Sequence, residues 1–276
     1  MGDRLIGLLN HFELTARVFQ AGPLCHSASF DAQDGLGYLH VLRSGKLKVD
    51  SGRRCSYLLE VPTLFFYMNP TSHRLIPQGN SVDIVCASFD FGAGLKNPLA
   101  KALPDALVLK LSDTPTLAAS LNLLFIEAQE KHCGQQAVLN RLMEIIVVQL
   151  FRDLMDEQRM QVGLLAGLAE PKLARAINAI HSEPSRDWTL EGLAGVAGMS
   201  RARFAARFRD TVGMTPGSYL TEWRIGIAQS LLRRGKSVQL IASEVGYANA
   251  SALSRAFATQ VGVSPTEWKK RHASEL

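Results

Sequence analysis

The stretch Ala197–Pro216, "AGMSRARFAARFRDTVGMTP", has the same plan as Val245–Pro265, "VGYANASALSRAFATQVGVSP". Each copy begins with a glycine turn and continues as a helix that carries few large apolar residues. With Phe208 placed on Phe257, an offset of 49 residues, the other matches are Phe204 with Leu253, Gly213 with Gly262 and Pro216 with Pro265. The repeat predicts one structural device that is used twice.

The plan of each copy is that of a helix-turn-helix. A small residue, Ala194 or Ala242, stands where two helices would cross closely, and a turn with Gly198 or Gly246 follows it. A polar residue, Ser200 or Asn249, then stands in position to cap the second helix. That helix uses only a narrow apolar face for the core, which leaves its other face free to enter the major groove of DNA.

The free faces of these helices supply the candidate DNA contacts. Arg203 and Arg255 have the side-chain geometry for bidentate contact with guanine. Phosphate contacts, which give affinity without sequence information, are predicted for Arg201, Arg207 and Arg209. Polar contacts to bases or phosphates are predicted for Asn249, Ser251 and Ser254. For any single arginine, a solvated surface charge is the alternative.

Charge distribution agrees with a polyanion partner for this part of the chain. The whole chain has a formal net charge of +5, whereas residues 171–276, with 15 Lys and Arg against 8 Asp and Glu, carry +7. Between the two copies, the segment Thr215–Gly235 has Pro at its start and Gly at its end, as a helix would. It predicts a spacer helix that holds the two units at a fixed distance.

From about Glu170 to Arg271 the chain resembles the DNA-binding domain of the AraC/XylS family of bacterial transcription regulators. The resemblance rests on "WTLEGLAGVAGMSRARFAARFRDTVGMTPGSYLTEWRI" and "IASEVGYANASALSRAFATQVGVSPTEWKKR", and on the repeated Gly-x-(Ser/Thr)-Pro ending. It implies two helix-turn-helix units joined by a linker helix, binding to double-stranded promoter DNA, and contact with RNA polymerase, usually as an activator.

The amino-terminal half predicts a different architecture. Residues from about Leu36 to Phe91 form short segments of alternating polarity separated by turns, which favour a small antiparallel barrel or sandwich. From Thr116 onward the period becomes helical. The fold class is therefore α+β, with residues 1–160 as a cupin-like sensory and dimerisation domain, 161–170 as a linker and 171–276 as the DNA-binding domain.

One helix of this half has an unusually wide apolar face. Its main stripe is widened by Ile145, Val147, Val148 and Phe151 beyond what one packing surface needs. Burial against both the barrel and a second subunit, in a homodimer, is the preferred interpretation, and enclosure within its own domain is the alternative. The stripe itself consists of Leu139, Leu142, Met143, Ile146, Leu150 and Leu154.

The amino-terminal half is similar to the cupin-type sensory domain of the same family, in particular to the regulators that respond to reactive chlorine species. The shared features are Cys25, "HVLRSGKLKV" from His40, "NPTSHRL" with His73 and "DIVCASF" with Cys86. Where a cupin usually has Gly-Asp before an apolar run and Pro, the segment "VPTLFFYM" places Pro62 and Met68, so the rim of the pocket departs from the family pattern.

Four sulfur and imidazole donors are the candidate sensor residues: Cys25, His40, His73 and Cys86. They are of the types that hold Zn or Cu, and the cysteine pair is also oxidisable. Cys86 alternates with apolar residues as a core cysteine does, so simple packing is the alternative. A small organic effector against Phe65, Phe66 and Tyr67 is a further possibility.

Other classes of protein fit less well. A cupin metalloenzyme generally needs a His-x-His pair, which "LHVL" around His40 does not provide, so we expect no enzyme. An architectural DNA-binding protein would leave the barrel unexplained. The amino terminus lacks the pattern of a signal peptide and the apolar runs are too short to span a bilayer, so we expect a cytoplasmic protein without membrane contact. Cys55 and Cys133 have no chemical context.

Overall fold

The computed structural model describes residues 3–32, 36–52, 56–90, 106–157 and 159–272. Cys55 lies outside these residues. The described chain forms two compact units. One, the barrel unit, consists of the described residues within 14–90 and 106–157, and the other, the helical unit, consists of residues 3–13 together with 159–272. Within the described ranges of the whole chain, no helix is long and apolar enough to cross a lipid bilayer.

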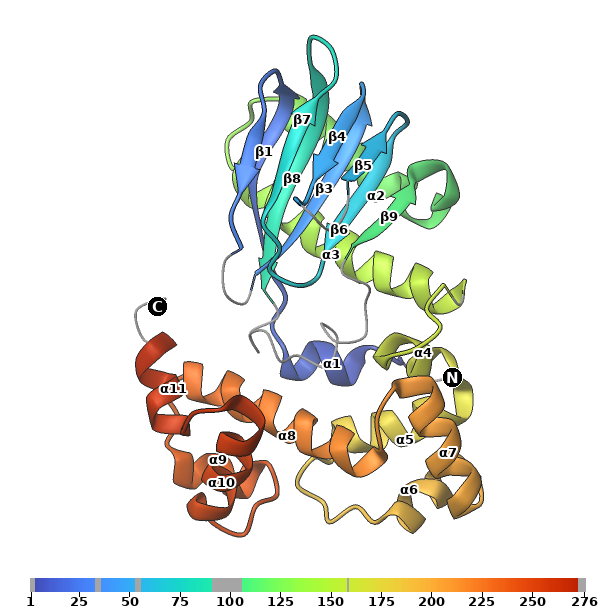
Figure 1. Ribbon diagram of the computed structural model, residues 1–276, viewed down its shortest axis with the longest axis vertical. Coiled ribbons are helices and arrows are strands. Elements are labelled where there is room, and N and C mark those ends of the chain that lie inside the picture. The colour runs from blue at the N-terminus through green and yellow to red at the C-terminus, as the bar shows by residue number, and fades with distance from the viewer. Residues whose placement is uncertain (1–2, 33–35, 53–55, 91–105, 158, 273–276) are drawn as a thin grey trace. The chain divides into compact units, whose positions relative to one another are not determined.

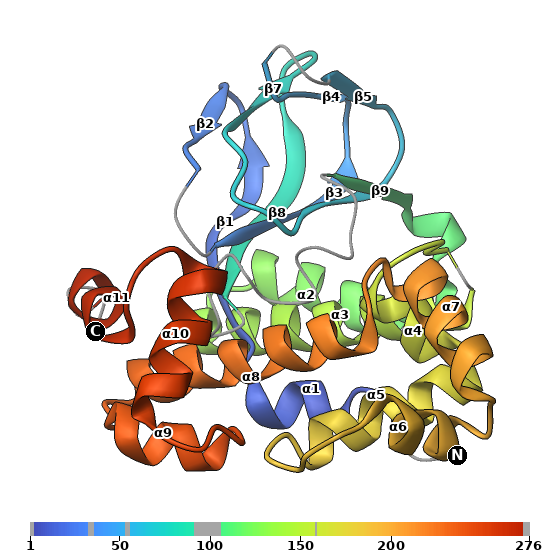
Figure 2. The same cartoon turned by 60° about the horizontal axis from the view of Figure 1, so that its bottom comes forward.

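The barrel unit contains two antiparallel sheets that face each other (Figures 1 and 2). Apart from one hairpin in the smaller sheet, strands that neighbour each other are not consecutive in the chain, so neither sheet is a simple meander. The larger sheet has the order β1 (Thr15–Leu24), β8 (Val82–Asp90), β3 (Gly37–Ser44), β6 (Thr63–Tyr67), β9 (Leu107–Lys110). The smaller sheet has the order β2 (Ala28–Phe30), β7 (His73–Pro77), β4 (Leu47–Asp50), β5 (Ser56–Leu59).

The central strands of the larger sheet, β8, β3 and β6, are largely buried on both faces, which the expected alternation of polar and apolar residues did not indicate. Phe65 belongs to the core between the sheets, whereas its neighbour Phe66 stacks on Phe89 and meets Phe151 of α3 (Gln135–Asp156). A strand covered on both sides needs apolar residues at successive positions. All five residues of β6 are accordingly buried.

Helix α3 also protects the edge of this sheet. The Val18 backbone N–H of β1 donates to Asn140 Oδ1 over 2.8 Å, and Gln136 Nε2 donates to the Val18 carbonyl over 2.7 Å. The Ala16 N–H donates to Glu144 Oε1 over 3.2 Å. Free backbone groups on an edge strand are open to pairing with another chain, and here side chains of α3 occupy them.

The remaining elements of the barrel unit are the short 3-10 helices η2 (Leu111–Asp113) and η3 (Pro115–Leu117), and α2 (Ala118–Gln129), which packs on α3. The six residues of the predicted stripe on α3 are all buried. Of the residues that widen it, Val147 and Phe151 are buried, Val148 is half-buried and Ile145 is exposed. The wide face is thus enclosed on one side and open on the other.

The helical unit contains the two predicted helix-turn-helix pairs. The first is α6 (Leu190–Ala197) with α7 (Arg201–Val212), and the second is α9 (Val238–Glu244) with α10 (Ala250–Val261). Between them runs α8 (Pro216–Arg233), which contacts both pairs (Figure 1). The other helices are α1 (Ile6–His11), α4 (Leu164–Ala169), α5 (Pro171–Ser182) and α11 (Pro265–His272).

Two segments that the sequence placed outside the DNA-binding domain are folded into the helical unit. Residues 161–170, predicted as a linker, contain α4, whose Leu165 and Leu168 are fully buried. Residues 3–13 carry α1, and the Phe12 ring beyond it meets the Trp223 ring of α8 edge-on at 5.0 Å. Both additions bury apolar side chains that the DNA-binding helices alone would leave exposed to water.

Candidate nucleic-acid interface and sensor core

The two second helices of the helix-turn-helix pairs each bury one narrow face, as predicted. On α7, Phe204 and Phe208 are fully buried, and the Phe208 ring lies 5.7 Å from Tyr219 of α8. On α10, Leu253 and Phe257 are buried, and the Phe257 ring lies 6.1 Å from Trp268 of α11. Two large side chains one turn apart hold each helix on the core and leave the rest of its circumference in solvent.

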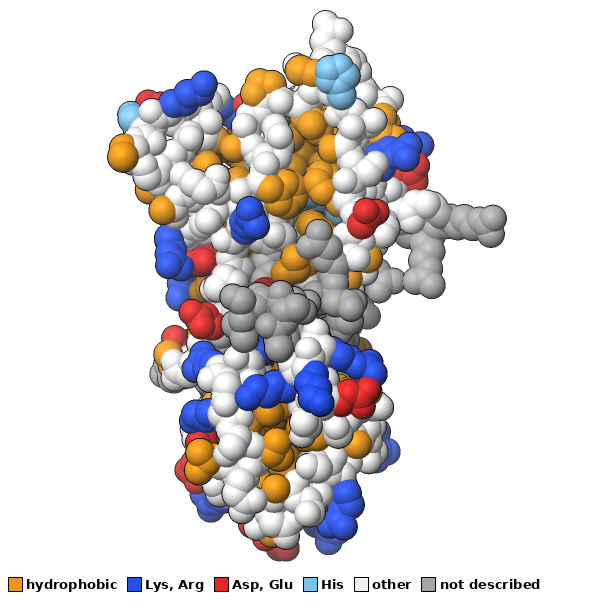
Figure 3. All heavy atoms as spheres, turned by 90° about the vertical axis from the view of Figure 1, so that its left-hand side faces the viewer, with side chains coloured by type: hydrophobic (Ala, Val, Ile, Leu, Met, Phe, Trp, Pro, Cys, Tyr) orange, Lys and Arg blue, Asp and Glu red, His pale blue; other side chains and the backbone are white. Residues whose placement is uncertain are grey.

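The predicted contact residues of α7 lie on that solvent-exposed surface. Arg201, Arg203, Arg207 and Arg209 are all exposed. Arg207 is already paired, because its Nε donates to Glu170 Oε2 over 2.8 Å. Figure 3 faces the opposite end of the helical unit, where α9, α10 and α11 lie, and Lys and Arg side chains are spread over that face as well. The first pair therefore presents a strongly cationic helix.

The second pair presents a smaller and more neutral surface. On α10, Ser251 and Arg255 are exposed and Ser254 is half-buried. Asn249 caps α10, since its Oδ1 accepts a hydrogen bond from the Ala252 N–H over 2.9 Å. That bond uses one of the two acceptor positions of the Asn249 amide oxygen, and the amide NH₂ keeps its two donors for a ligand. Ser200 occupies the equivalent position before α7 without making a side-chain cap bond.

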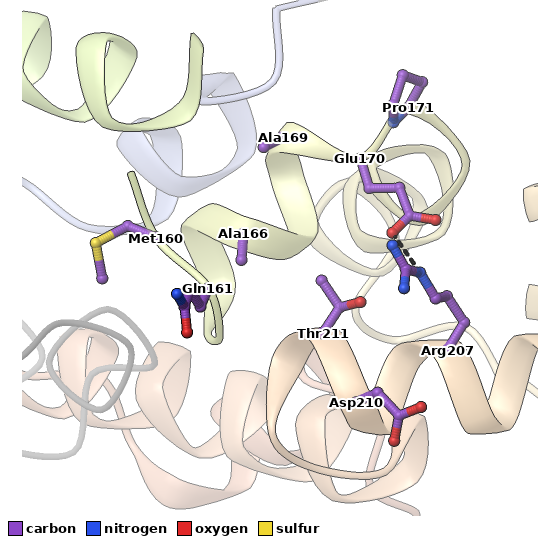
Figure 4. A pocket seen from close by; sticks show the side chains of 9 residues that line it. All are labelled: Met160, Gln161, Ala166, Ala169, Glu170, Pro171, Arg207, Asp210 and Thr211. Atoms are coloured by element: carbon purple, nitrogen blue, oxygen red, sulfur yellow. Dashed lines mark hydrogen bonds and ion pairs between the residues drawn. The ribbon is translucent and has the colours of Figure 1, made fainter. Parts of the chain in front are cut away.

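A cavity of about 440 Å³ lies where α4 and the start of α5 meet α7 (Figure 4). The Gly163 N–H donates to the Thr211 carbonyl over 2.8 Å beside it. In Figure 4 the Arg207 and Glu170 side chains reach toward each other along one wall. No sequence pattern predicts this pair, because its members are 37 residues apart and the packing of α4 on α7 brings them together. The lining residues are Met160, Gln161, Ala166, Ala169, Glu170, Pro171, Arg207, Asp210 and Thr211.

In the barrel unit, two of the four predicted sensor residues are in direct contact. His40 of β3 and His73 of β7 are buried, and their Nε2 atoms lie 2.7 Å apart. His73 Nδ1 lies 2.8 Å from the Thr71 carbonyl, which can only accept, so this nitrogen carries a proton. Neutral His73 then accepts at Nε2 from the Nε2–H of His40. Among the residues that the structure describes, the buried Nδ1 of His40 has no hydrogen-bond partner.

Burial keeps this histidine pair uncharged near neutral pH. It lowers the pKa of His40 well below the ordinary histidine value, and the neighbouring His73 lowers it further. Burial also lowers the pKa of His73, against the opposing effect of the Thr71 carbonyl. Aromatic rings surround the pair: Tyr67 lies 4.7 Å and Phe30 5.0 Å from the His73 ring. These rings form an apolar wall around two imidazoles.

The two cysteines lie in different surroundings. Cys86 of β8 is opposite His40 in the strand register and fully buried, and burial raises the pKa of its thiol. Cys25 is exposed and follows Leu24, which pairs with Val82 four positions along β8 from Cys86. At about 3.3 Å per residue this places the two cysteines more than about 13 Å apart, too far for a disulfide without movement of the backbone.

In the described part of the chain, the histidine pair has too few neighbouring metal-ligand side chains to form a metal site. Within the described residues, no three His, Cys, Asp or Glu side chains lie close enough together to hold a metal ion. The structure therefore brings His40, His73 and the neighbouring strand position of Cys86 together and leaves Cys25 apart from them.

Comparison with known proteins matches each unit to a family model. A cupin model matches residues 3–156 and a helix-turn-helix model matches residues 193–271. The chain belongs to the AraC-like transcription regulators with an amino-terminal cupin domain. The family is one of DNA-binding regulators, which agrees with the expectation of a protein that is not an enzyme.

Individual relatives cover the AraC-like chain to different extents. A putative AraC-like transcription regulator of Streptomyces lividans is 36% identical over 70% of this chain, which spans 65% of that protein's length. The RCS-specific HTH-type transcriptional activator RclR of Escherichia coli is 30% identical over 86% of this chain and 87% of its own. The DNA-binding domain of AdpA, solved with a target DNA, is 30% identical over 38% of this chain and 96% of its own, with a TM-score of 0.37.

Proposed function

We propose that this chain regulates transcription by reading promoter DNA with α7 and α10 while its barrel unit responds to an effector. The observation that carries the proposal is the repeated arrangement of two helices, each held by two buried apolar side chains and each exposing an arginine to solvent. Both helices contact α8, so one molecule would offer two reading surfaces to one DNA duplex. The protein would act in the cytoplasm, where such DNA is found.

The proposed DNA contacts are of two main kinds, contacts to bases and contacts to phosphates. Arg203 of α7 and Arg255 of α10 read bases, and Arg201 and Arg209 neutralise phosphates. Arg207 contributes less to DNA affinity than the sequence suggested, because Glu170 already neutralises its charge. Ser251, Ser254 and the free amide group of Asn249 add shorter polar contacts on α10.

Fluorescence anisotropy with Arg203→Ala and Arg255→Ala tests the base contacts, first on the DNA upstream of the gene and then on random-sequence duplexes. Each substitution should cost about 1 to 3 kcal/mol of binding free energy on the upstream DNA and little on random DNA, because only base contacts distinguish the two. Lys172→Ala removes an exposed charge from α5 and is the control. Equal losses on both DNAs would show that the two arginines contact phosphates.

Self-association and polymerase contact are part of the same proposal. Ile145 of α3 and Leu123 and Ile126 of α2 are 46%, 50% and 53% exposed. Apolar side chains that gather on one pair of helices are typical of a protein interface, and a second copy of this chain is the partner we propose for them. A homodimer bound upstream of a gene would then contact RNA polymerase as an activator.

The similarity to RclR favours an oxidant as the effector to which the barrel unit responds. Of Cys25 and Cys86, an oxidant would reach the exposed thiol of Cys25 first, whereas Cys86 is buried and its thiol resists ionisation. The alternatives are a Zn or Cu ion at His40 and His73, or a small organic ligand held by the aromatic rings around them.

A further inference from the structure

Arg224, near the middle of α8, joins parts of the helical unit that belong to different helix-turn-helix pairs. Its Nε donates to the Pro184 carbonyl over 2.7 Å, and a terminal nitrogen donates to the Arg186 carbonyl over 2.9 Å. Both carbonyls belong to the loop that leads into α6 and the first pair. The planar guanidinium thus holds two successive points of one loop with a fixed geometry.

The same guanidinium meets the turn of the second pair. Gly246, between α9 and α10, has a φ of +80°, and a Cβ added there would lie 2.8 Å from an Arg224 nitrogen. That Cβ would also lie 2.7 Å from the Ser185 carbonyl oxygen, so the turn touches the loop directly. The Tyr247 ring stands 5.7 Å from the guanidinium carbon of Arg224. In Figures 1 and 2 the loop before α6 and the turn after α9 lie side by side along α8.

The loop that Arg224 holds is itself tightly folded. Trp188 Nε1 donates to the Glu183 carbonyl over 2.9 Å, and Arg186 pairs with the Glu183 carboxylate at 3.1 Å. The Arg186 guanidinium also lies 4.2 Å above the Trp188 ring. Because these contacts hold the loop together tightly, a displacement of Arg224 would move α6 and would not be taken up by deformation of the loop.

The ends of α8 are joined to the two pairs through glycines in the left-handed region. Gly213 precedes α8 with a φ of +85°, and Gly235 follows it with a φ of +84°. Glycine adopts such φ values readily, so the chain can change direction at each end of α8. The contacts of Arg224 with the loop and with the Gly246 turn join the two pairs a second time, away from those ends.

We propose that Arg224 sets the distance and the rotational phase between α7 and α10, so that the protein accepts one separation between its two DNA boxes. The inference rests on the proposed function, because it requires both helices to read DNA. Arg224 itself contacts neither of the two DNA segments that α7 and α10 read, and it acts as a positioning residue. Inserting one base pair moves the second box by about 3.4 Å and turns it by about 35°, which a rigid helical unit cannot follow.

Affinity selection of full-length wild type and Arg224→Ala from a random-sequence duplex library tests the proposal. The wild type should enrich two boxes at one separation, and Arg224→Ala should enrich the same two boxes at several separations. On the selected DNA, a one-base-pair insertion should weaken wild-type binding at least about tenfold, the factor of one lost base contact, and Arg224→Ala binding by no more than about threefold.

Two further variants separate positioning from general loss of structure. Arg234→Ala removes an exposed charge at the end of α8 that pairs with Glu13 at 3.6 Å, and it should keep the wild-type spacing preference. Arg224→Lys keeps the charge and the apolar stem but cannot bond both carbonyls in the same plane, so it should show an intermediate insertion penalty. Because Arg224→Lys preserves packing, it answers the question even if Arg224→Ala does not fold.

The outcomes distinguish this inference from the proposed function. If both Arg224 variants keep the single wild-type separation and the full insertion penalty, Arg224 has no positioning role, while reading by two helices stands. If the wild type itself enriches one box or none, reading by two helices fails and the inference fails with it.

Discussion

At the scale of single residues, burial determines what each predicted site residue can do. Arg203 and Arg255 keep their charge in solvent, Arg207 is paired with Glu170, and Asn249 uses its carbonyl oxygen as a helix cap. The residue types were visible in the sequence. Their partners were not, because Glu170 and Arg207 come from segments with no local pattern in common.

The difference between the two cysteines leads to a prediction for oxidant sensing. Hypochlorous acid should convert the Cys25 thiol to a sulfenic acid before it modifies Cys86 in the folded protein, because Cys25 is exposed whereas Cys86 is buried and burial raises its pKa. Cys133 is exposed as well, so the experiment compares Cys25 with Cys86 in a Cys133→Ser background. Mass spectrometry of the treated protein measures both sites. DNA binding, followed by anisotropy, should change reversibly in the wild type.

Cys86→Ser is the matched control for Cys25→Ser in this experiment. The response of DNA binding should disappear in Cys25→Ser and persist in Cys86→Ser. Modification of Cys86 before Cys25 would contradict the assignment, and an unchanged affinity in every variant would exclude the oxidant as effector and favour a ligand at the histidine pair.

At the scale of elements, the apolar period of α3 predicted its buried stripe correctly, since the six stripe residues lie inside the barrel unit. The apolar period does not predict which of the additional apolar residues on α3 are exposed to solvent. Val147 and Phe151 are buried and Ile145 is exposed, because the packing of α2 and β1 on α3 decides how much of the helix is covered.

The exposed side of α3 gives a prediction for self-association. Ile145→Asp should weaken the dimer at least about tenfold, because it places a charge in an apolar contact that excludes water. Sedimentation equilibrium measures the dissociation constant. Val61→Asp, at 45% exposure before β6 in the same unit, is the control and should leave the dimer intact. Equal behaviour of the two variants would remove α3 from the interface.

At the scale of the whole molecule, the folded units do not follow the order of the chain. The amino-terminal residues 3–13 belong with the helices that begin at residue 159. His11 Nε2 lies 2.8 Å from the His181 carbonyl, and the His181 ring stacks on Trp223 with centroids 3.5 Å apart. The fully buried Phe12 side chain completes this aromatic group.

Phe12→Ala should therefore destabilise the helical unit by about 3 to 5 kcal/mol, through lost burial and the cavity that remains. The three tryptophans of the chain, Trp188, Trp223 and Trp268, all lie in the helical unit, so tryptophan fluorescence during urea unfolding reports on this unit alone. Ile6→Ala, at a side chain that is 47% exposed, should cost less than about 0.5 kcal/mol. A loss for Phe12→Ala as small as the control would show that residues 3–13 do not stabilise the helical unit.

The sequence by itself determined the repeated helix-turn-helix, its narrow buried faces and the set of exposed arginines. These features depend on spacings of three and four residues and on glycine turns, which are local and can be read along the chain. The tertiary structure decided which distant residues meet: His40 with His73, Glu170 with Arg207, Arg224 with the Gly246 turn, and Phe12 with Trp223. Contacts across such separations follow from how whole sheets and helices pack, and local spacing carries no record of that packing.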